Sequence, residues 1–194
     1  MLMPAPPTPS FALNQTRRTF SCSQLLPLEA DILWKIERGI VRTFTWNEEG
    51  RSITLGYWGA GDIVGQPLSR IQPYQIECLT SAEVSILPPN LWYQATDAMI
   101  SHIQRSEELL AIIHSRPVNQ RLLELLGWLA QRFGREVDKG KLIEVPLTHQ
   151  ALSEVICTTR VTVTRLLNQF EHKGLINRHG RYLIICRKSQ TLDF

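Results

Sequence analysis

The chain has 194 residues, of which 43% are hydrophobic and 20% charged, and its formal net charge is +3. This length fits one large or two small domains with real hydrophobic cores. No apolar run approaches the roughly 20 residues of a membrane span, so we expect a cytoplasmic protein with no membrane association. The four cysteines are scattered without a CxxC pair, which predicts reduced thiols, no metal site and no cofactor. A redox role for Cys157 is the lesser alternative.

The first half of the chain has the pattern of a small β domain. Residues 1–17 are rich in proline and lack the order of a secretory signal, so we expect a mobile tail there. Between residues 18 and 89, short β-type runs alternate with turn signals, which predicts an antiparallel β-roll or barrel. Asp62 is interpreted as a turn residue. The aromatic side chains are interpreted as core and rim rather than as a cofactor cage: Trp34, Trp46, Tyr57 and Trp58. The expected strands are 32–36, 39–46, 52–58, 63–64, 74–79 and 83–87.

A long helix is predicted over residues 90–114. Its side chains step by four and three residues in a short heptad seam, and this spacing favours a parallel homodimer. The same stripe could instead pack on its own β-roll. The candidate dimer interface consists of Met99, Ile103, Ser106, Leu110 and Ile113.

Residues 115–194 are predicted to form a second domain. Ser115 can cap a helix that starts with Pro117 and ends near Phe133, and a short strand is expected over 141–146. Thr148 then caps an amphipathic run, the chain turns at Cys157, and Thr158 or Thr159 caps a second helix that Gly174 closes. The apolar positions of the two helices recur at helical spacing: Ala151, Leu152, Val155 and Ile156, then Val163, Leu166, Leu167 and Phe170.

This layout, followed by a hairpin over 175–186, is that of a winged helix-turn-helix. The second helix of such a pair enters the major groove of DNA, where arginine can pair with guanine. The candidate base-reading residues are Arg160, Val161, Thr164 and Arg165. The candidate contacts to the DNA backbone are Thr148, Gln150, Thr159, Thr162, His179 and Arg181. An ordinary solvated surface is the competing interpretation for any one of these charges, but the caps, turn and wing together favour double-stranded DNA as the partner.

The charge distribution agrees with this prediction. Residues 141–194 hold eight Lys and Arg against four Asp and Glu, whereas residues 1–140 hold 13 against 14. The basic excess therefore lies in the C-terminal quarter, as expected for a part that meets phosphates.

The order of parts resembles the Crp/Fnr family of bacterial transcription regulators, and the similarity extends over residues 18–186. It is carried locally by residues 33–42, 47–58 and 61–65 in the β-roll and by 147–185 in the DNA module. The segment TRVTVTRLL at 159–167 is similar to the recognition helix of the cyanobacterial nitrogen-control regulator NtcA. The resemblance implies an α+β chain with an N-terminal cupin-like, cyclic-nucleotide-binding-domain-like β-roll, a dimerisation helix and a C-terminal winged helix-turn-helix. It also implies a GTA-like half-site, because homologues with valine at the Val161 position are expected to read one, whereas family members with glutamate there read a different base.

The chain departs from the family where Crp-type rolls bind cyclic nucleotide. The family's Gly-Glu pair is replaced by Gly65-Gln66-Pro67, and residues 70–77 lack the Arg-Ser pair that holds the phosphate. A buried phosphate without such partners would cost on the order of several kcal/mol, so no gating by cyclic nucleotide is expected. The cysteine spacing of Fnr is absent, and His102 and His114 do not identify a haem ligand.

The leading hypothesis is thus a homodimeric transcription regulator that reads a palindromic operator. The alternative is a small-molecule sensor whose β-roll binds an unidentified effector, for instance a carboxylate met by Arg42 or Arg51. An enzyme has little support, since no catalytic constellation is present. RNA polymerase would be a further partner of an activator, and the sequence leaves activator and repressor both open.

Overall fold

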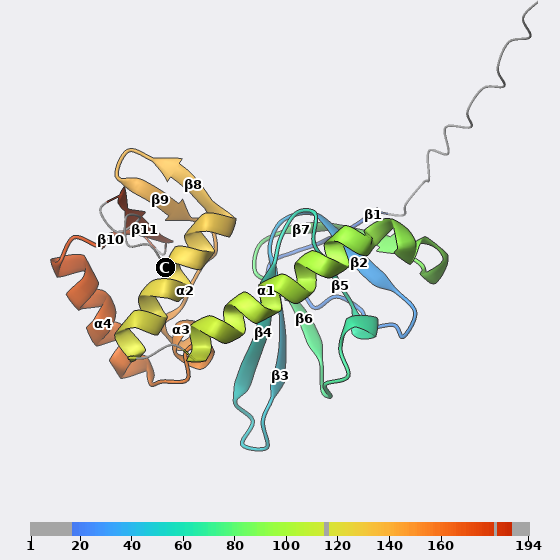
Figure 1. Cartoon of the computed structure of the whole chain (residues 1–194), viewed down its shortest axis with the longest axis horizontal. Helices are drawn as coiled ribbons and strands as arrows, with labels where there is room; N and C mark the ends of the chain where they lie inside the picture. Colours follow the sequence, from blue (N-terminus) through green and yellow to red (C-terminus); the bar gives the residue numbers. More distant parts are fainter. Residues whose placement is uncertain (1–16, 115–116, 181, 188–194) are drawn as a thin grey trace, which may run out of the picture.

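The computed structural model describes residues 17–114, 117–180 and 182–187, which form two lobes connected by a long helix (Figure 1). The predicted tail therefore lies outside the described residues, except for Arg17. That residue begins a first strand that the sequence did not predict, β1.

The N-terminal lobe is a β-roll of two antiparallel sheets. One sheet has the strand order β1-β7-β2-β5 and the other has the order β4-β3-β6. The predicted antiparallel roll is confirmed, and the observed strands lie within two residues of the expected ones. Their bounds are β1 Arg17–Phe20, β2 Leu33–Arg38, β3 Val41–Trp46, β4 Ser52–Trp58, β5 Ile63–Val64, β6 Gln75–Cys78 and β7 Ala82–Leu87.

Aromatic side chains fill the inside of this roll. Trp34, Trp58 and Tyr74 are 0%, 2% and 5% exposed, and they pack with aliphatic residues from both sheets. Trp58 donates its indole N–H to Thr43 Oγ1 over 3.0 Å, so its polar atom is satisfied in the core. Trp46 is 38% exposed near the β3–β4 turn. The interpretation of the aromatic residues as core and rim is confirmed.

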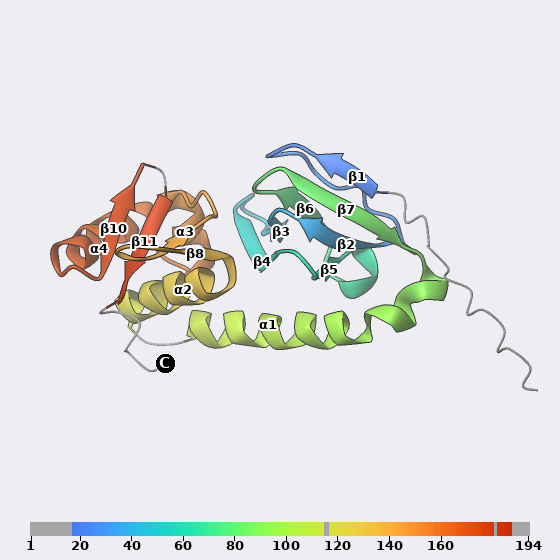
Figure 2. The same cartoon turned by 90° about the horizontal axis from the view of Figure 1, so that it is seen from above.

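The connecting segment contains two kinds of helix. The predicted helix over 90–114 is correct from Thr96 onward, where α1 (Thr96–His114) begins, but Pro89–Ala95 forms a 3₁₀ helix, η2. Trp92 ties that helix to the roll by donating its indole N–H to the carbonyl of Leu87 over 3.1 Å. Figure 2 shows α1 running along one side of the roll. There the ring of His102 stacks on Trp58 with centroids 3.8 Å apart, and its Nδ1 lies 3.1 Å from the Ile63 carbonyl oxygen.

The C-terminal lobe is a winged helix-turn-helix, so the predicted fold class is confirmed. Pro117 caps its first helix instead of opening it, and the predicted cap Ser115 lies outside the described residues. The hairpin formed by β8 and β9 was not predicted as a hairpin, and the strand expected over 141–146 is shorter. The elements are α2 Val118–Phe133, β8 Gly134–Val137, β9 Gly140–Ile143, α3 His149–Val155, α4 Arg160–His172, β10 Ile176–His179 and β11 Tyr182–Cys186, with the sheet order β10-β11-β9-β8.

The two lobes share one hydrophobic cluster. Ile40 and Tyr57 of the roll and Leu109 of α1 pack with the buried leucines of α2 and the apolar face of α3. Tyr57 is 1% exposed, and burial raises the pKa of its hydroxyl to about 12. Burial of apolar surface thus fixes the DNA module against the roll. Within the described part of the chain, every helix is too short or too polar to cross a bilayer.

Candidate DNA-reading surface

The helix-turn-helix is held by two threonine caps. Thr148 Oγ1 accepts a hydrogen bond from Ala151 N over 3.0 Å at the start of α3. Thr159 Oγ1 accepts one from Thr162 N over 3.1 Å at the start of α4, which decides between the two caps that the sequence allowed. Cys157 lies in the turn at a positive φ of 52°, so the chain reverses direction there. Each cap satisfies an N–H that a helix start otherwise leaves unpaired.

The apolar face of α4 packs inward and leaves its other face open. Val163, Leu166, Leu167 and Phe170 are buried against α3 and the wing. On the opposite face Arg160 and Arg165 are exposed, and Val161 is 78% exposed. Figure 2 shows α4 at the end of the molecule remote from the roll. Three of the four predicted base-reading side chains therefore project into solvent from one helix.

Thr164 is placed differently from the other three. Its hydroxyl donates to the Arg160 carbonyl oxygen over 2.9 Å and lies 2.8 Å from His149 Nδ1. Because a hydroxyl carries one proton, His149 must donate from Nδ1 to the Thr164 oxygen. Burial, with Arg178 and Arg160 nearby, lowers the pKa of His149 and favours the neutral ring, in which this bond selects the tautomer with hydrogen on Nδ1. Thr164 and His149 thus connect α4 to α3, a link that the sequence analysis missed.

The wing is attached to α4 by an arginine that the sequence analysis also missed. Arg178 on β10 donates from Nη2 to Asn168 Oδ1 over 2.6 Å, and its Nε lies 3.3 Å from Glu171 Oε2. His179 is exposed at the end of β10, and the predicted backbone contact Arg181 lies outside the described residues. The ionic and amide contacts of Arg178 fix the hairpin beside α4.

The remaining predicted backbone contacts lie around the two helix starts. Thr148, Gln150 and Thr159 are exposed, and Thr162 is half-buried. Gln150 donates to Glu154 Oε1 over 2.9 Å. Thr159 and Thr162 share a hydroxyl–hydroxyl bond of 2.9 Å. These side chains therefore lie at or within three residues of the starts of α3 and α4.

The predicted seam of α1 divides between two faces. Ile103 and Leu110 are 59% and 55% exposed. Met99 packs against the roll near η2, Ile113 packs against the core of the C-terminal lobe, and Ser106 donates to the His102 carbonyl oxygen over 2.8 Å. Ile100, which the sequence analysis did not select, is 48% exposed on the side of Ile103.

An ionic cluster joins the roll to both long helices. Asp62 is 4% exposed, Arg105 of α1 pairs with its Oδ1, and Arg132 of α2 donates from Nη2 to its Oδ2 over 2.8 Å. Gly59 N also donates to Oδ2, over 2.8 Å. The interpretation of Asp62 as a turn residue was therefore incomplete, because this carboxylate closes its turn and also holds two distant helices.

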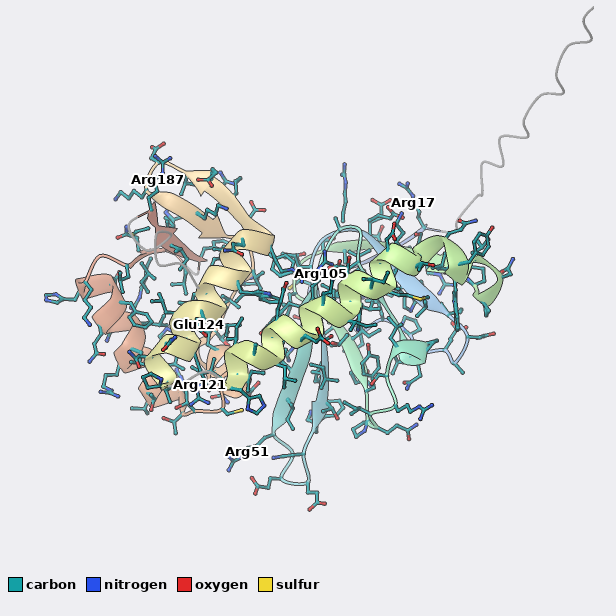
Figure 3. All side chains as sticks on the ribbon, viewed as in Figure 1. Arg17, Arg51, Arg105, Arg121, Glu124 and Arg187 are labelled. Carbon is teal, nitrogen blue, oxygen red and sulfur yellow. The ribbon has the colours of Figure 1, made fainter. Side chains whose placement is uncertain are left out.

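The arginines proposed for a carboxylate effector already have acidic partners. Arg42 Nε lies 2.7 Å from Glu77 Oε2, and its guanidinium stacks over Phe44. Arg51 lies at the tip of the β3–β4 hairpin and pairs with Glu49 over 3.1 Å (Figure 3). Among the described residues, no group of three His, Cys, Asp or Glu side chains could hold a metal ion.

The sequence of the chain is similar to those of known regulatory proteins. The model of the Crp-like helix-turn-helix domain family matches residues 120–192. The regulatory protein CysR of Synechococcus elongatus is 41% identical over 191 residues, which cover 96% of this chain and 91% of CysR. The chain belongs to the Crp/Fnr family. It is a DNA-binding transcription regulator, as the sequence analysis predicted.

More distant Crp/Fnr proteins are similar over most of their length. The fumarate and nitrate reduction regulatory protein of Escherichia coli is 24% identical over 170 residues, which cover 81% of this chain and 68% of that protein. The crystal structure of a Crp-family transcriptional regulator from Thermus thermophilus has a TM-score of 0.77 with 22% identity. The match covers 89% of this chain and 96% of that one, so the same fold accommodates very different sequences.

Proposed function

We propose that this Crp/Fnr regulator binds a palindromic operator as a homodimer, with one α4 helix in each of two successive major grooves. The observation that carries the proposal is the exposed triad Arg160, Val161 and Arg165 on a helix that is capped, packed and fixed to its wing. Two such helices must lie about 34 Å apart to read grooves one turn apart. Thr164 contributes its methyl group at most, since its hydroxyl is bonded within the protein.

The half-site is GTA-like in this proposal. The triplet contains one guanine, and Arg165 donates to its O6 and N7, which discriminates by about 1–3 kcal/mol. Arg160, at the start of the same helix, reads a base pair beside the triplet. Val161 offers only methyl groups, which suit the methyl of thymine. This assignment rests on the similarity of residues 159–167 to NtcA and on the exposure of these side chains.

The dimer contact is formed by the exposed stripe of α1. Ile100, Ile103, Glu107, Leu110 and His114 recur at three- and four-residue intervals and are all exposed in the single chain. That spacing is a heptad seam, so two parallel α1 helices can pack along it. This proposed seam keeps Ile103 and Leu110 from the seam expected from the sequence. It has Ile100, Glu107 and His114 in place of Met99, Ser106 and Ile113.

DNA binding is not gated by a cyclic nucleotide in the roll. In Crp-type rolls the segment that corresponds to residues 70–77 supplies the arginine that contacts the phosphate. Here the arginine of that segment, Arg70, is exposed. Aromatic side chains occupy the inside of the roll. A small barrel filled by side chains leaves little room for a nucleotide.

Selection of bound sequences from random DNA tests the whole proposal, because it returns the half-site, the spacing and the symmetry together. We expect an inverted repeat of GTA-like half-sites. Arg165→Ala should lose about 1–3 kcal/mol of discrimination at one base pair, whereas Arg51→Ala, at the far hairpin tip, should bind like the wild type. An unchanged sequence preference in Arg165→Ala would remove the base-reading role.

A further inference from the structure

A cavity lies between the β-roll and the C-terminal lobe. It has a volume of about 410 Å³ and is lined by residues of the roll, α1 and α2, among them Gly59, Asp62, Arg105, Arg132 and Phe133. This volume lies within the range of small-molecule sites, which often occur where domains meet. The cavity is separate from the inside of the roll, where Crp-type proteins bind nucleotide.

Its two arginines are held in place before any ligand arrives. The Arg132 guanidinium stacks over Trp128 and Phe133, 4.9 and 5.0 Å from the ring centroids. Arg105, labelled on α1 in Figure 3, pairs with the same carboxylate, Asp62. Within the described residues, the buried Nη1 of Arg132 has no hydrogen-bond partner. A guanidinium that is already oriented and has an N–H without a partner can donate to a further oxygen ligand.

The acidic groups around the arginines are already engaged. Asp62 Oδ2 accepts from Gly59 N as well as from Arg132. Glu144 pairs with Arg135 over 3.1 Å, and Glu108 accepts the indole N–H of Trp128 over 2.8 Å. Burial and the neighbouring Arg105 lower the pKa of Arg132 to about 10, as expected where two like charges share one carboxylate. A second anion would relieve that repulsion.

We propose that this cavity binds a small oxyanion, either a carboxylate or an inorganic sulfate or phosphate, through the guanidinium groups of Arg105 and Arg132. An anion that bridges them connects α1 to α2 and competes with Asp62 for both. The site would thus respond to a metabolite at the junction of the two lobes instead of inside the roll. Anion binding itself does not depend on how α4 reads DNA, so the two proposals fail independently.

Calorimetric titration of the full chain without DNA tests the site. The probes are sodium succinate, sodium sulfate and sodium phosphate, each compared with sodium chloride at equal ionic strength, and their relative affinities separate the carboxylate from the inorganic anions. We expect saturable binding of at least one probe, weakened at least about tenfold in Arg132→Met, where a charged hydrogen bond is lost. Arg135→Met, which removes an exposed arginine paired with Glu144, is the matched control and should bind like the wild type.

Arg105→Gln provides a second test if Arg132→Met fails to fold, because Arg105 is more exposed, at 31% of its side chain against 14%. It should also weaken binding about tenfold. The proposal is overturned if the wild type binds none of the three anions, or if the cavity variants and Arg135→Met bind them equally. Operator binding is measured on the same protein preparations. It shows whether sequence-specific DNA binding is retained, whether or not the anions bind.

Discussion

At the scale of single residues, Val161 occupies an unusual position. A β-branched side chain that is 78% exposed on a helix contributes little to folding, while Val163, two residues later, is fully buried. The family similarity identified Val161 as a base-reading residue, and in the structure its methyl groups are exposed and free to contact a base.

Val161→Glu should change which base pair is preferred and leave the fold intact. The new carboxylate would accept from cytosine N4 and would lose the apolar contact with thymine, so we expect a preference change of about 1–3 kcal/mol at one position. Competition binding with half-site variants measures it. A base preference that is the same at every position before and after the change would exclude a reading role for this residue.

His102 gives the protein a dependence on pH. Burial lowers its pKa below the usual 6.5, against the opposing effect of the bond to the Ile63 carbonyl. As the pH falls through 6.5, the unfolded chain binds a proton before the folded chain does, so the free energy of unfolding decreases. Urea unfolding between pH 7.5 and 5 should show a shallower decrease in His102→Gln. A residual slope is expected from His149, whose pKa is also lowered, and identical slopes would contradict the assignment to His102.

At the scale of elements, the proposed α1 seam leads us to expect opposite effects on dimer stability from substitutions at Glu107 and Leu110. In a parallel dimer each seam residue faces its own copy, so Glu107 meets Glu107 between Ile103 and Leu110. Glu107→Leu should tighten the dimer by removing like charges, and Leu110→Glu should dissociate it by adding them. Sedimentation equilibrium measures both, and two variants that assemble like the wild type would place the interface elsewhere.

The helices of the DNA module could be predicted because local chemistry defines them. Threonine caps, apolar residues every three or four positions and Gly174, which adopts a φ of +70°, all lie within one stretch of sequence. Strand β8 has no such pattern, since its outer residues are half-buried and its inner ones exposed. The residues predicted for the α1 seam mix exposed and packed positions, because the stripe that packs on the two lobes and the stripe that faces solvent are offset by about one residue.

At the scale of the whole molecule, Asp62 connects the lobes through partners far away in sequence. No spacing rule relates Asp62 to Arg105 or Arg132, and a Gly-Asp turn is a complete local explanation, so sequence analysis could not predict this cluster. The cavity between the β-roll and the C-terminal lobe could not be predicted for the same reason, because its walls come from the roll, α1 and α2.

Asp62→Asn should destabilise the chain by on the order of 3 kcal/mol, because it leaves two partly buried guanidinium groups without their carboxylate. The amide can still accept from Gly59 N, so the turn is preserved. Glu49→Gln removes a surface pair and should change stability by less than about 0.5 kcal/mol. Chemical denaturation compares the two, and similar small losses would show that the cluster adds little to the fold.

The approach of Gly59 to α2 has a genetic consequence. A Cβ at this position would lie 2.9 Å from Cε1 of Phe133, so even alanine would push that ring, which lines the cavity between the lobes. Selections for mutants that ignore their physiological signal should therefore recover substitutions in this turn, and those mutants should still recognise the same promoters.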